Sequence, residues 1–446
     1  MPPATVADMP IVLALADRVT GDDLDPIQAC QQLDQPQHGL IHFSGKGRSE
    51  HDLLIQLKQM EAFGAQQLLL LSGDRLPGHH PEHLPVRYLE SVCALQTARQ
   101  HCPEWLLGAA LNPFKYCEED GSAQYLKARK KLLAGADFLT LQLGFDVAKH
   151  AEALRWMALQ ATPKPLLACV MAVTAKQTKF LKQTPGVVLS PGLEQRLKQE
   201  MQANPVQAQQ LSVQRLALHI VGLKLMGFAG IHLSGIHQRQ ALLELGQALK
   251  HWQQRIDNLH DWRETWEQIW RDEAGHGVCF QPQQHDWQLG QSAVAATTRE
   301  RLRYRVLSNL HNTLFSHAHP MGRAMGWALT QPHWQQPNAA RWLHHLEQGL
   351  KRPLVGCESC GTCRLDQTLY VCPETCPKGL ANGPCGGTQF NRCEFDDREC
   401  IHSVKYRIAK TVNKLPILAE NLIAVVPAST RGTSSWPRWF NPAPMK

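Results

Sequence analysis

The sequence predicts an α/β protein built on a parallel sheet with repeated strand-helix units. Short apolar runs alternate with amphipathic segments, and several runs end at small or acidic residues. The clearest run, Leu68 to Leu71, stops at Ser72, Gly73 and Asp74. Four apolar residues ending in such a turn are typical of a strand buried on both faces. Asp74 then lies at the carboxyl end of a strand, where α/β proteins bind ligands.

Seven strands are predicted between residues 11 and 235. They are Ile11 to Asp17, Leu40 to Ser44, Leu68 to Asp74, Leu106 to Asn112, Phe138 to Asp146, Leu166 to Val173, and Ile231 to Ser234. The clearest intervening helix runs from Ser49 to Phe63, with capping-box spacing between Ser49 and Asp52 and a stop at Gly64. Units of about 30 residues imply right-handed crossovers in a closed or open sheet. A closed (β/α)8 barrel needs an eighth strand, so one is missing or hidden.

The remainder of the chain is predicted to be mainly helical around a cysteine-rich segment. Residues 235 to 352 are rich in Trp and His without metal-ligand spacing, which favours a packed helical connector. Its tryptophans are Trp252, Trp262, Trp266, Trp270, Trp287, Trp327, Trp334 and Trp342. Ser403 to Val426 fits one or two helices, and the Pro-, Ser- and Thr-containing tail from Pro427 to Lys446 is predicted to be mobile.

Composition indicates a globular protein with a large core. The 446 residues are 43% apolar and 19% charged. No apolar run reaches the roughly 20 residues of a membrane span, and the apolar stretch from Met9 lacks a basic leader, which argues against a secretory signal. The net charge of +7 is scattered and gives little support for a nucleic-acid partner.

Eight of the fourteen cysteines lie close together, which predicts a local metal-binding module. They are Cys357, Cys360, Cys363, Cys372, Cys376, Cys385, Cys393 and Cys400. Such local density favours a metal site in a reducing compartment over a disulfide framework or a set of reduced structural thiols. Eight thiolates fit two four-cysteine sites, or one site with spare cysteines. All-sulfur ligation suits both zinc and iron-sulfur clusters, and the opening Cys-x2-Cys-x2-Cys triplet slightly favours iron-sulfur.

The ordered motifs resemble the methylenetetrahydrofolate reductase family. The resemblance rests on Leu40 to Ser44, Leu70 to Asp74, Gly108 to Pro113, Ala134 to Phe138 with Gln142 and Asp146, and Gly230 to Leu233. The run from Cys376 to Gly387 resembles the cysteine-rich C-terminal domain of that reductase, which in some bacteria is similar to a separate partner subunit.

This resemblance implies a (β/α)8-type barrel lacking its first strand, then a helical connector and a small cysteine-rich metal-binding domain. We expect the barrel at 1–250, the connector at 251–351, and the metal-binding domain with the C-terminal tail at 352–446. It also implies a cytoplasmic flavoprotein of one-carbon metabolism that binds FAD or FMN and reduces a folate substrate. The electron donor is left open between a nicotinamide cofactor, NADH or NADPH, and a protein, and a protein partner or homo-oligomer is expected.

Site residues follow from the same resemblance. Asp74 and Gln142 match catalytic positions, Asp74 tuning the flavin and Gln142 contacting the folate. His42, Gly73, Asn112 and Lys131 match flavin-contacting positions, and Ser72 stands where other members often carry Arg.

The chain departs from the family at its first strand, because no residue before Ile11 matches the catalytic Glu of that strand. An upstream start, a strand supplied by another polypeptide, or loss of the reaction would each explain this. The alternative hypothesis is therefore a non-catalytic or electron-transferring partner subunit with a degenerate barrel.

Overall fold

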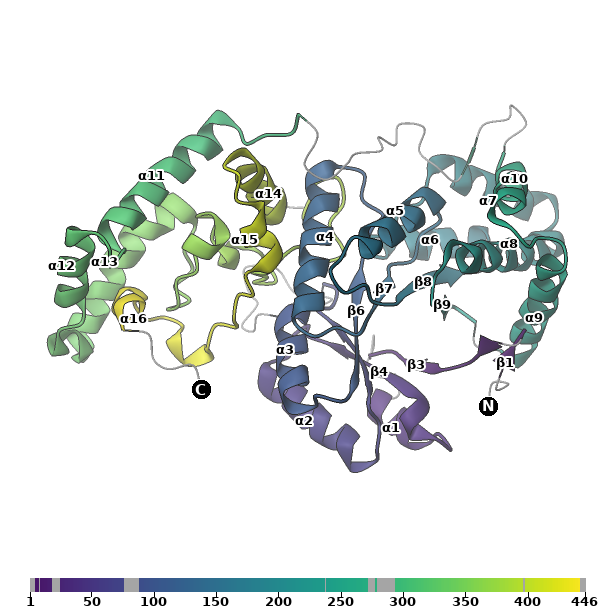
Figure 1. Ribbon diagram of the computed structural model, residues 1–446, viewed down its shortest axis with the longest axis horizontal. Helices are drawn as coiled ribbons and strands as arrows, with labels where there is room; N and C mark the ends of the chain where they lie inside the picture. The colour runs from purple at the N-terminus through teal and green to yellow at the C-terminus, as the bar shows by residue number, and fades with distance from the viewer. Residues whose placement is uncertain are drawn as a thin grey trace.

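The computed structural model describes the chain except residues 1–4, 8, 18–24, 76–87, 237, 272–276, 279–292, 396–397 and 442–446. Within this part, seven parallel strands form one curved sheet in sequence order (Figure 1). The strands are β3 (Leu13–Leu15), β4 (Gly39–Ser44), β5 (Gln67–Leu71), β6 (Leu106–Leu111), β7 (Phe138–Leu141), β8 (Leu166–Met171) and β9 (Gly230–Ser234). The predicted α/β barrel that lacks one strand is therefore confirmed.

The seven predicted strands are all present, although some end earlier than predicted. The strand expected to reach Asp146 stops at Leu141. Asp146 instead caps the next helix, since its carboxylate accepts hydrogen bonds from the backbone N–H groups of Ala148 and Lys149. A carboxylate that accepts hydrogen bonds from the first free N–H groups of a helix marks the start of that helix. Asp146 therefore begins α5 and does not belong to β7.

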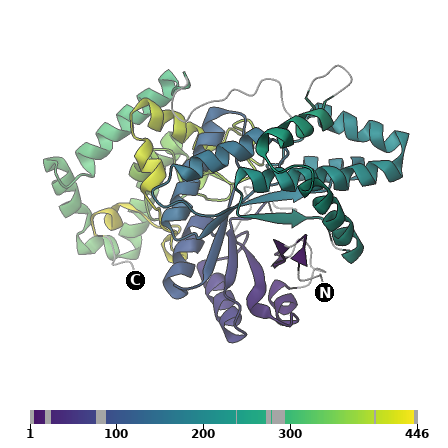
Figure 2. The ribbon, with the colours of Figure 1, turned by 45° about the vertical axis from the view of Figure 1, so that its right-hand side comes forward.

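The sheet is open, because in the described residues β3 and β9 are not paired with each other. The N-terminal strands β1 (Thr5–Val6) and β2 (Met9–Pro10) form a separate antiparallel hairpin. This hairpin contacts the helix that follows β9 and lies beside the open side of the sheet (Figure 2).

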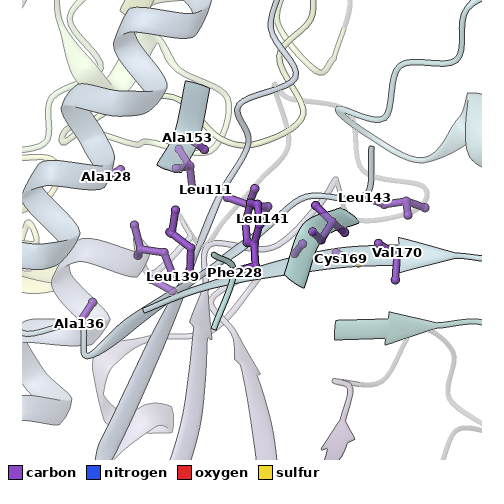
Figure 3. Packing of buried hydrophobic residues seen from close by; sticks show 14 of the residues in the cluster. Leu111, Ala128, Ala136, Leu139, Leu141, Leu143, Ala153, Cys169, Val170 and Phe228 are labelled. Carbon is purple, nitrogen blue, oxygen red and sulfur yellow. The ribbon is translucent and has the colours of Figure 1, made fainter. Parts of the chain in front are cut away.

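Helices on the outer face cover the sheet. They are α1 (Pro26–Gln31), α2 (Glu50–Ala62), α3 (Ser91–His101), α4 (Glu118–Leu133), α5 (Val147–Ala158), α6 (Ala175–Gln183), α7 (Pro191–Ala203), α8 (Pro205–Met226) and α9 (Arg239–Gln253). The predicted capping box starts α2, because Ser49 and Asp52 each bond the other's backbone N–H. Figure 3 shows Leu139 and Leu141 of β7 among the side chains packed between sheet and helices.

The predicted connector is helical. It contains α10 (Leu259–Ile269), α11 (Thr298–Leu314), α12 (Pro320–Leu329) and α13 (Pro337–Val355). Helix α10 packs on α8, where the buried Trp262 donates its indole N–H to the Leu218 carbonyl at 2.8 Å. Trp287 lies outside the described residues. Helices α11 to α13 form a lobe to one side of the barrel (Figure 1).

The C-terminal region corrects one prediction. Ser403 to Val426 forms two helices as expected, α14 (Ile401–Thr411) and α15 (Leu415–Glu420), and both pack on α4. The tail after Pro427 is predicted to be mobile, but its described part forms helix α16 (Trp436–Phe440), and Trp436 is buried against the lobe. Residues 442–446 of the tail lie outside the described residues. The prediction is wrong because the apolar surface of Trp436 and Phe440 stabilises this segment by packing on the lobe, despite the neighbouring Pro and Ser residues. No helix in the described part of the chain is long and apolar enough to cross a membrane.

Candidate functional site

Three predicted polar residues lie at one edge of the sheet. Asp74 follows β5, Asn112 follows β6 and Gln142 follows β7, and these strands are neighbours. Because the strands are parallel, their carboxyl ends meet at this edge, where ligands of α/β proteins bind. The order of the strands therefore brings together the residues that the sequence singled out.

The cysteine module covers part of this edge. The side-chain amide of Asn112 donates to the carbonyls of Gly186 and Gly386, at 2.9 and 2.8 Å. Lys115 donates to the carbonyls of Gly386 and Thr388, and Gln124 to that of Cys385 at 2.7 Å. The loop around Gly386 therefore lies directly on residues of the barrel.

Gly186 permits this close approach. It has φ +77°, and a Cβ at this position would lie 2.0 Å from the Gly386 carbonyl oxygen. A larger residue would push the module away from the barrel edge.

Asp74 lies beside a buried ion pair supplied by the module. Lys378 pairs with Glu394, and both side chains are almost fully buried. Lys378 also donates to the Gly73 carbonyl at 2.8 Å, and Glu394 accepts the backbone N–H of Arg75 at 2.7 Å. The surrounding protein and the nearby Glu394 carboxylate raise the pKa of Asp74. Two carboxylates thus meet the ammonium groups of Lys378 and Lys46 where barrel and module touch.

Polar side chains lie inside the barrel below this edge, beside the apolar cluster of Leu40, Leu69 and Phe138. The rings of His42 on β4 and His232 on β9 lie 5.8 Å apart, which places both inside the curved sheet. Burial and the neighbouring His232 lower the pKa of His42 to about 4, so its imidazole is neutral at pH 7. Within the described residues, His42 Nε2 and Thr140 Oγ1 are buried without a hydrogen-bond partner. Such atoms are usually satisfied by a ligand or water.

The predicted flavin-contacting residues differ in whether their polar atoms already have hydrogen-bond partners within the protein. Gly73 has φ +84°, and a Cβ there would lie 2.2 Å from Ser44 Oγ, so the turn requires glycine. Asn112 uses its amide nitrogen on two carbonyls and its oxygen on the Phe114 N–H. The Lys131 ammonium donates to the Ala110 carbonyl, and burial and Lys127 lower its pKa to about 7. His42 therefore offers a flavin the clearest unused polar atom.

Gln142 is held by the loop before α7. Its amide nitrogen donates to the Pro185 carbonyl at 3.1 Å, and its oxygen accepts the Leu143 N–H at 2.9 Å. This geometry leaves the role of Gln142 in folate contact a prediction.

Seven of the eight cysteines of the module fall into two groups. Cys357, Cys360, Cys363 and Cys372 line one small cavity together with Lys351. Burial, with the three other thiols nearby, raises the pKa of Cys372 to about 12. Cys376, Cys385 and Cys400 lie near one another in the second region. The backbone N–H of Cys393 donates to the Arg398 carbonyl. This division resembles two sites more than one.

Each group offers only thiol ligands, and such ligands bind both zinc and iron-sulfur clusters. Across the described residues, however, no three His, Cys, Asp or Glu side chains converge closely enough to hold a metal ion. The metal ligands therefore stay a prediction.

Sequence reasoning missed the residues that join module and barrel. Lys127 of α4 forms a 2.8 Å ion pair with Glu90, both almost fully buried, and Lys127 also donates to the Gly383 carbonyl. Several charged residues of α4 are buried in the same way. The one feature of the sequence that pointed to these residues was the density of charged side chains in one helix. By itself, such density indicates a solvated surface.

Comparison with protein-family models matches both parts of this arrangement. The model described as methylenetetrahydrofolate reductase covers residues 27–250, and the model described as methylene-tetrahydrofolate reductase C terminal covers residues 337–427. The chain belongs to the methylenetetrahydrofolate reductase family. The order of the two matches confirms the predicted fusion of a reductase-type barrel with the family's C-terminal domain.

No curated protein matches the chain at a significant level. One similar solved structure is described as an uncharacterized protein from Clostridium thermocellum that binds two copies of 5-methyl-5,6,7,8-tetrahydrofolic acid. It is 14% identical, with a TM-score of 0.38, over 55% of this chain and 85% of that chain.

Proposed function

We propose that this member of the methylenetetrahydrofolate reductase family is a flavoprotein that reduces 5,10-methylenetetrahydrofolate to 5-methyltetrahydrofolate. The observation that carries the proposal is a pair of polar atoms inside the barrel, His42 Nε2 and Thr140 Oγ1, which are buried without partners in the described structure. A ring with donors and acceptors along its edge would satisfy both atoms. Bound flavin would supply hydride transfer, which the side chains of the protein do not provide themselves.

The residues of the chain would bind and orient the reactants. His42, uncharged at pH 7, can hydrogen-bond a ring without adding charge. Asp74 at the edge would stabilise the positive charge of an iminium carbon. Gln142 carries both a donor and an acceptor for a pterin edge, although its present partners are the Pro185 carbonyl and the Leu143 N–H.

The module would complete the site from the side of β5 and β6. Glu394 and Lys378 fix the turn at Gly73, and the loop at Gly386 fixes Asn112. In this proposal the module excludes water from the edge and holds Asp74 in place. We further propose that its thiols bind zinc or an iron-sulfur cluster, because each group presents only sulfur ligands.

A second function, that of a partner subunit in a reductase complex, is supported by two observations. The polar atoms of the Asn112 side chain are already hydrogen-bonded within the protein. In the described residues, β3 and β9 also end the sheet without closing it. Unpaired strand edges favour pairing with another chain.

The visible absorption spectrum of anaerobically purified protein tests these two functions. A flavin band that bleaches when a reduced nicotinamide is added supports the reductase. Loss of that band in the His42→Leu variant, with a retained fold, would place the flavin in the barrel. A well-folded protein that binds neither flavin nor folate would contradict the reductase, and co-purification of a stable partner would then favour the second function.

A further inference from the structure

The helical lobe, which lies to one side of the barrel (Figure 1), exposes apolar side chains to solvent. Nine large apolar side chains are exposed on α11, α12 and α13. Seven of them form two stripes, which are Leu302, Val306 and Leu310 on α11 and Trp342, Leu346, Leu350 and Leu354 on α13. Members of a stripe follow one another at four-residue intervals, so they share one face of their helix. We call these seven residues the lobe surface.

The two stripes meet at an apolar hollow. Leu310 of α11 and Leu350 and Leu354 of α13 line the same cavity of about 220 Å³. Each of these three side chains is also about half exposed, so the hollow has an exposed rim. Continuous apolar areas on a soluble protein mark interaction sites. An amphipathic helix binds to such a groove by placing apolar side chains into it at helical spacing.

The charges around the lobe surface are mostly positive. Residues 298 to 355 contain eight Lys and Arg residues but two acidic residues. Glu300 pairs with Arg407 at 2.7 Å, and the buried Glu347 pairs with Lys351 at 2.6 Å. Asp366 lines the hollow, and its Oδ1 is buried. Seven of the basic residues are exposed arginines: Arg299, Arg301, Arg303, Arg305, Arg323, Arg341 and Arg352. The exposed charge of the three helices is therefore basic.

The arginines of α11 border its apolar stripe on both sides. Each residue of an α-helix is rotated by about 100° from the one before it. Relative to Leu302 and Val306, this rotation places Arg299 and Arg303 on one side and Arg301 and Arg305 on the other. An apolar stripe between two basic borders matches an apolar stripe between two acidic borders.

We propose that the lobe surface binds an acidic amphipathic helix of a partner protein. Its apolar side chains would pack between the two stripes, with one of them in the hollow, and its carboxylates would face the arginines. A second copy of the lobe surface does not fit, because arginines would then face arginines. The hollow favours a helix over an anionic membrane, because a helix presents single side chains that can fill it. The site lies outside the barrel and does not depend on the proposed reductase function.

Fluorescence anisotropy of labelled peptides, titrated with the full chain, tests this proposal. The probe is a peptide of about 18 residues, roughly 27 Å of helix, with Leu at every third or fourth position and Glu beside each Leu. Saturable binding is expected. A peptide with Lys in place of each Glu tests the charge, and one with Gln in place of each Leu tests the apolar stripe. Both should bind at least about tenfold more weakly.

Two variants of the protein test the location. Leu310→Glu places a negative charge at the rim of the hollow and should weaken binding of the acidic peptide at least about tenfold. Arg301→Glu/Arg305→Glu changes two exposed side chains and should weaken it by a similar factor, with less dependence on salt. The controls are Leu159→Glu, which is 85% exposed at the end of α5, and Arg263→Glu on α10. Both should bind the peptide like the wild-type protein.

Three results would overturn the proposal. The first is absence of saturable binding of the acidic peptide to the wild-type protein. The second is equal binding of the acidic and the Lys peptides, or binding that Leu310→Glu leaves unchanged in a protein of wild-type circular dichroism. The third is co-sedimentation with phosphatidylglycerol vesicles that Leu310→Glu abolishes, without binding of the peptide. That result would assign the lobe surface to an anionic membrane instead.

Discussion

Asn382 of the cysteine module and Glu90 of the barrel form a buried hydrogen-bonded contact. The Glu90 carboxylate accepts the backbone N–H of Asn382 at 3.0 Å and its side-chain amide at 3.1 Å. The Asn382 oxygen in turn accepts the Ile423 N–H at 2.8 Å. Both residues are buried, so neither can exchange this contact for water without opening the junction. The barrel and the module therefore share one polar network.

The first prediction concerns the charge balance of this junction. Glu90→Gln should lower the free energy of unfolding by about 3 kcal/mol, because it leaves the buried Lys127 ammonium without its ion-pair partner. Urea denaturation followed by tryptophan fluorescence measures this change.

The double variant Glu90→Gln/Lys127→Met provides the matched control. It should be more stable than Glu90→Gln alone, since the uncompensated charge is gone. Strictly additive effects of the two substitutions would show that the pair is not coupled.

The second prediction concerns Asp74. Asp74→Asn keeps the shape of the side chain and removes its charge, so folate turnover should fall by at least about tenfold while flavin retention changes little. Steady-state kinetics and the flavin absorbance of the purified variant separate the two effects. Unchanged turnover would remove Asp74 from the catalytic set, and loss of flavin would assign it a binding role instead.

The third prediction concerns the first cysteine group. Cys360→Ala should reduce the metal content of the purified protein and destabilise the C-terminal third, because metal binding in such modules contributes directly to folding. Metal analysis and limited proteolysis report the two effects. Cys117→Ala, outside the module, is the control and should keep its metal. A Cys360→Ala protein with full metal content would exclude Cys360 as a ligand.

Much of the barrel could be predicted because its strands are short apolar runs that a two-sided buried environment requires. Leu68 to Leu70 are buried as the run indicated. The end of β7 could not be predicted from hydrophobicity, because Asp146 acts as a helix cap only once α5 exists. The burial of Trp436 could likewise not be predicted from the sequence, since it depends on a lobe formed by helices that are distant in the chain.

The candidate site could be predicted only in part. The order of the strands placed Asp74, Asn112 and Gln142 at one edge, and this follows from sequence. The docking of the module does not, because the partners of Lys127 and Asn112 in the module lie more than 250 residues away in the chain. A charged helix such as α4 is indistinguishable from a solvated one until its partners are placed.

The last prediction concerns acid stability and rests on His150. This histidine is fully buried, its Nδ1 lies 3.0 Å from the Asp146 carbonyl oxygen, and burial lowers its pKa to about 4. An unfolded histidine has a pKa of about 6.5. As the pH falls from 7 to 5, the unfolded chain gains a proton at this position and the folded chain does not. The site therefore contributes stability above pH 6.5 that is lost on acidification, about 2 kcal/mol by pH 5.

The His150→Asn variant isolates this contribution, because Asn keeps a polar group near Nδ1 but does not titrate. Its free energy of unfolding should fall less between pH 7 and pH 5 than that of the wild-type protein, by about 2 kcal/mol. Urea denaturation at the two pH values measures both slopes. His260→Asn is the control, since that side chain is 80% exposed on α10 and should leave the slope unchanged. Equal slopes for wild type and His150→Asn would mean that His150 is protonated in the folded protein or accessible to water.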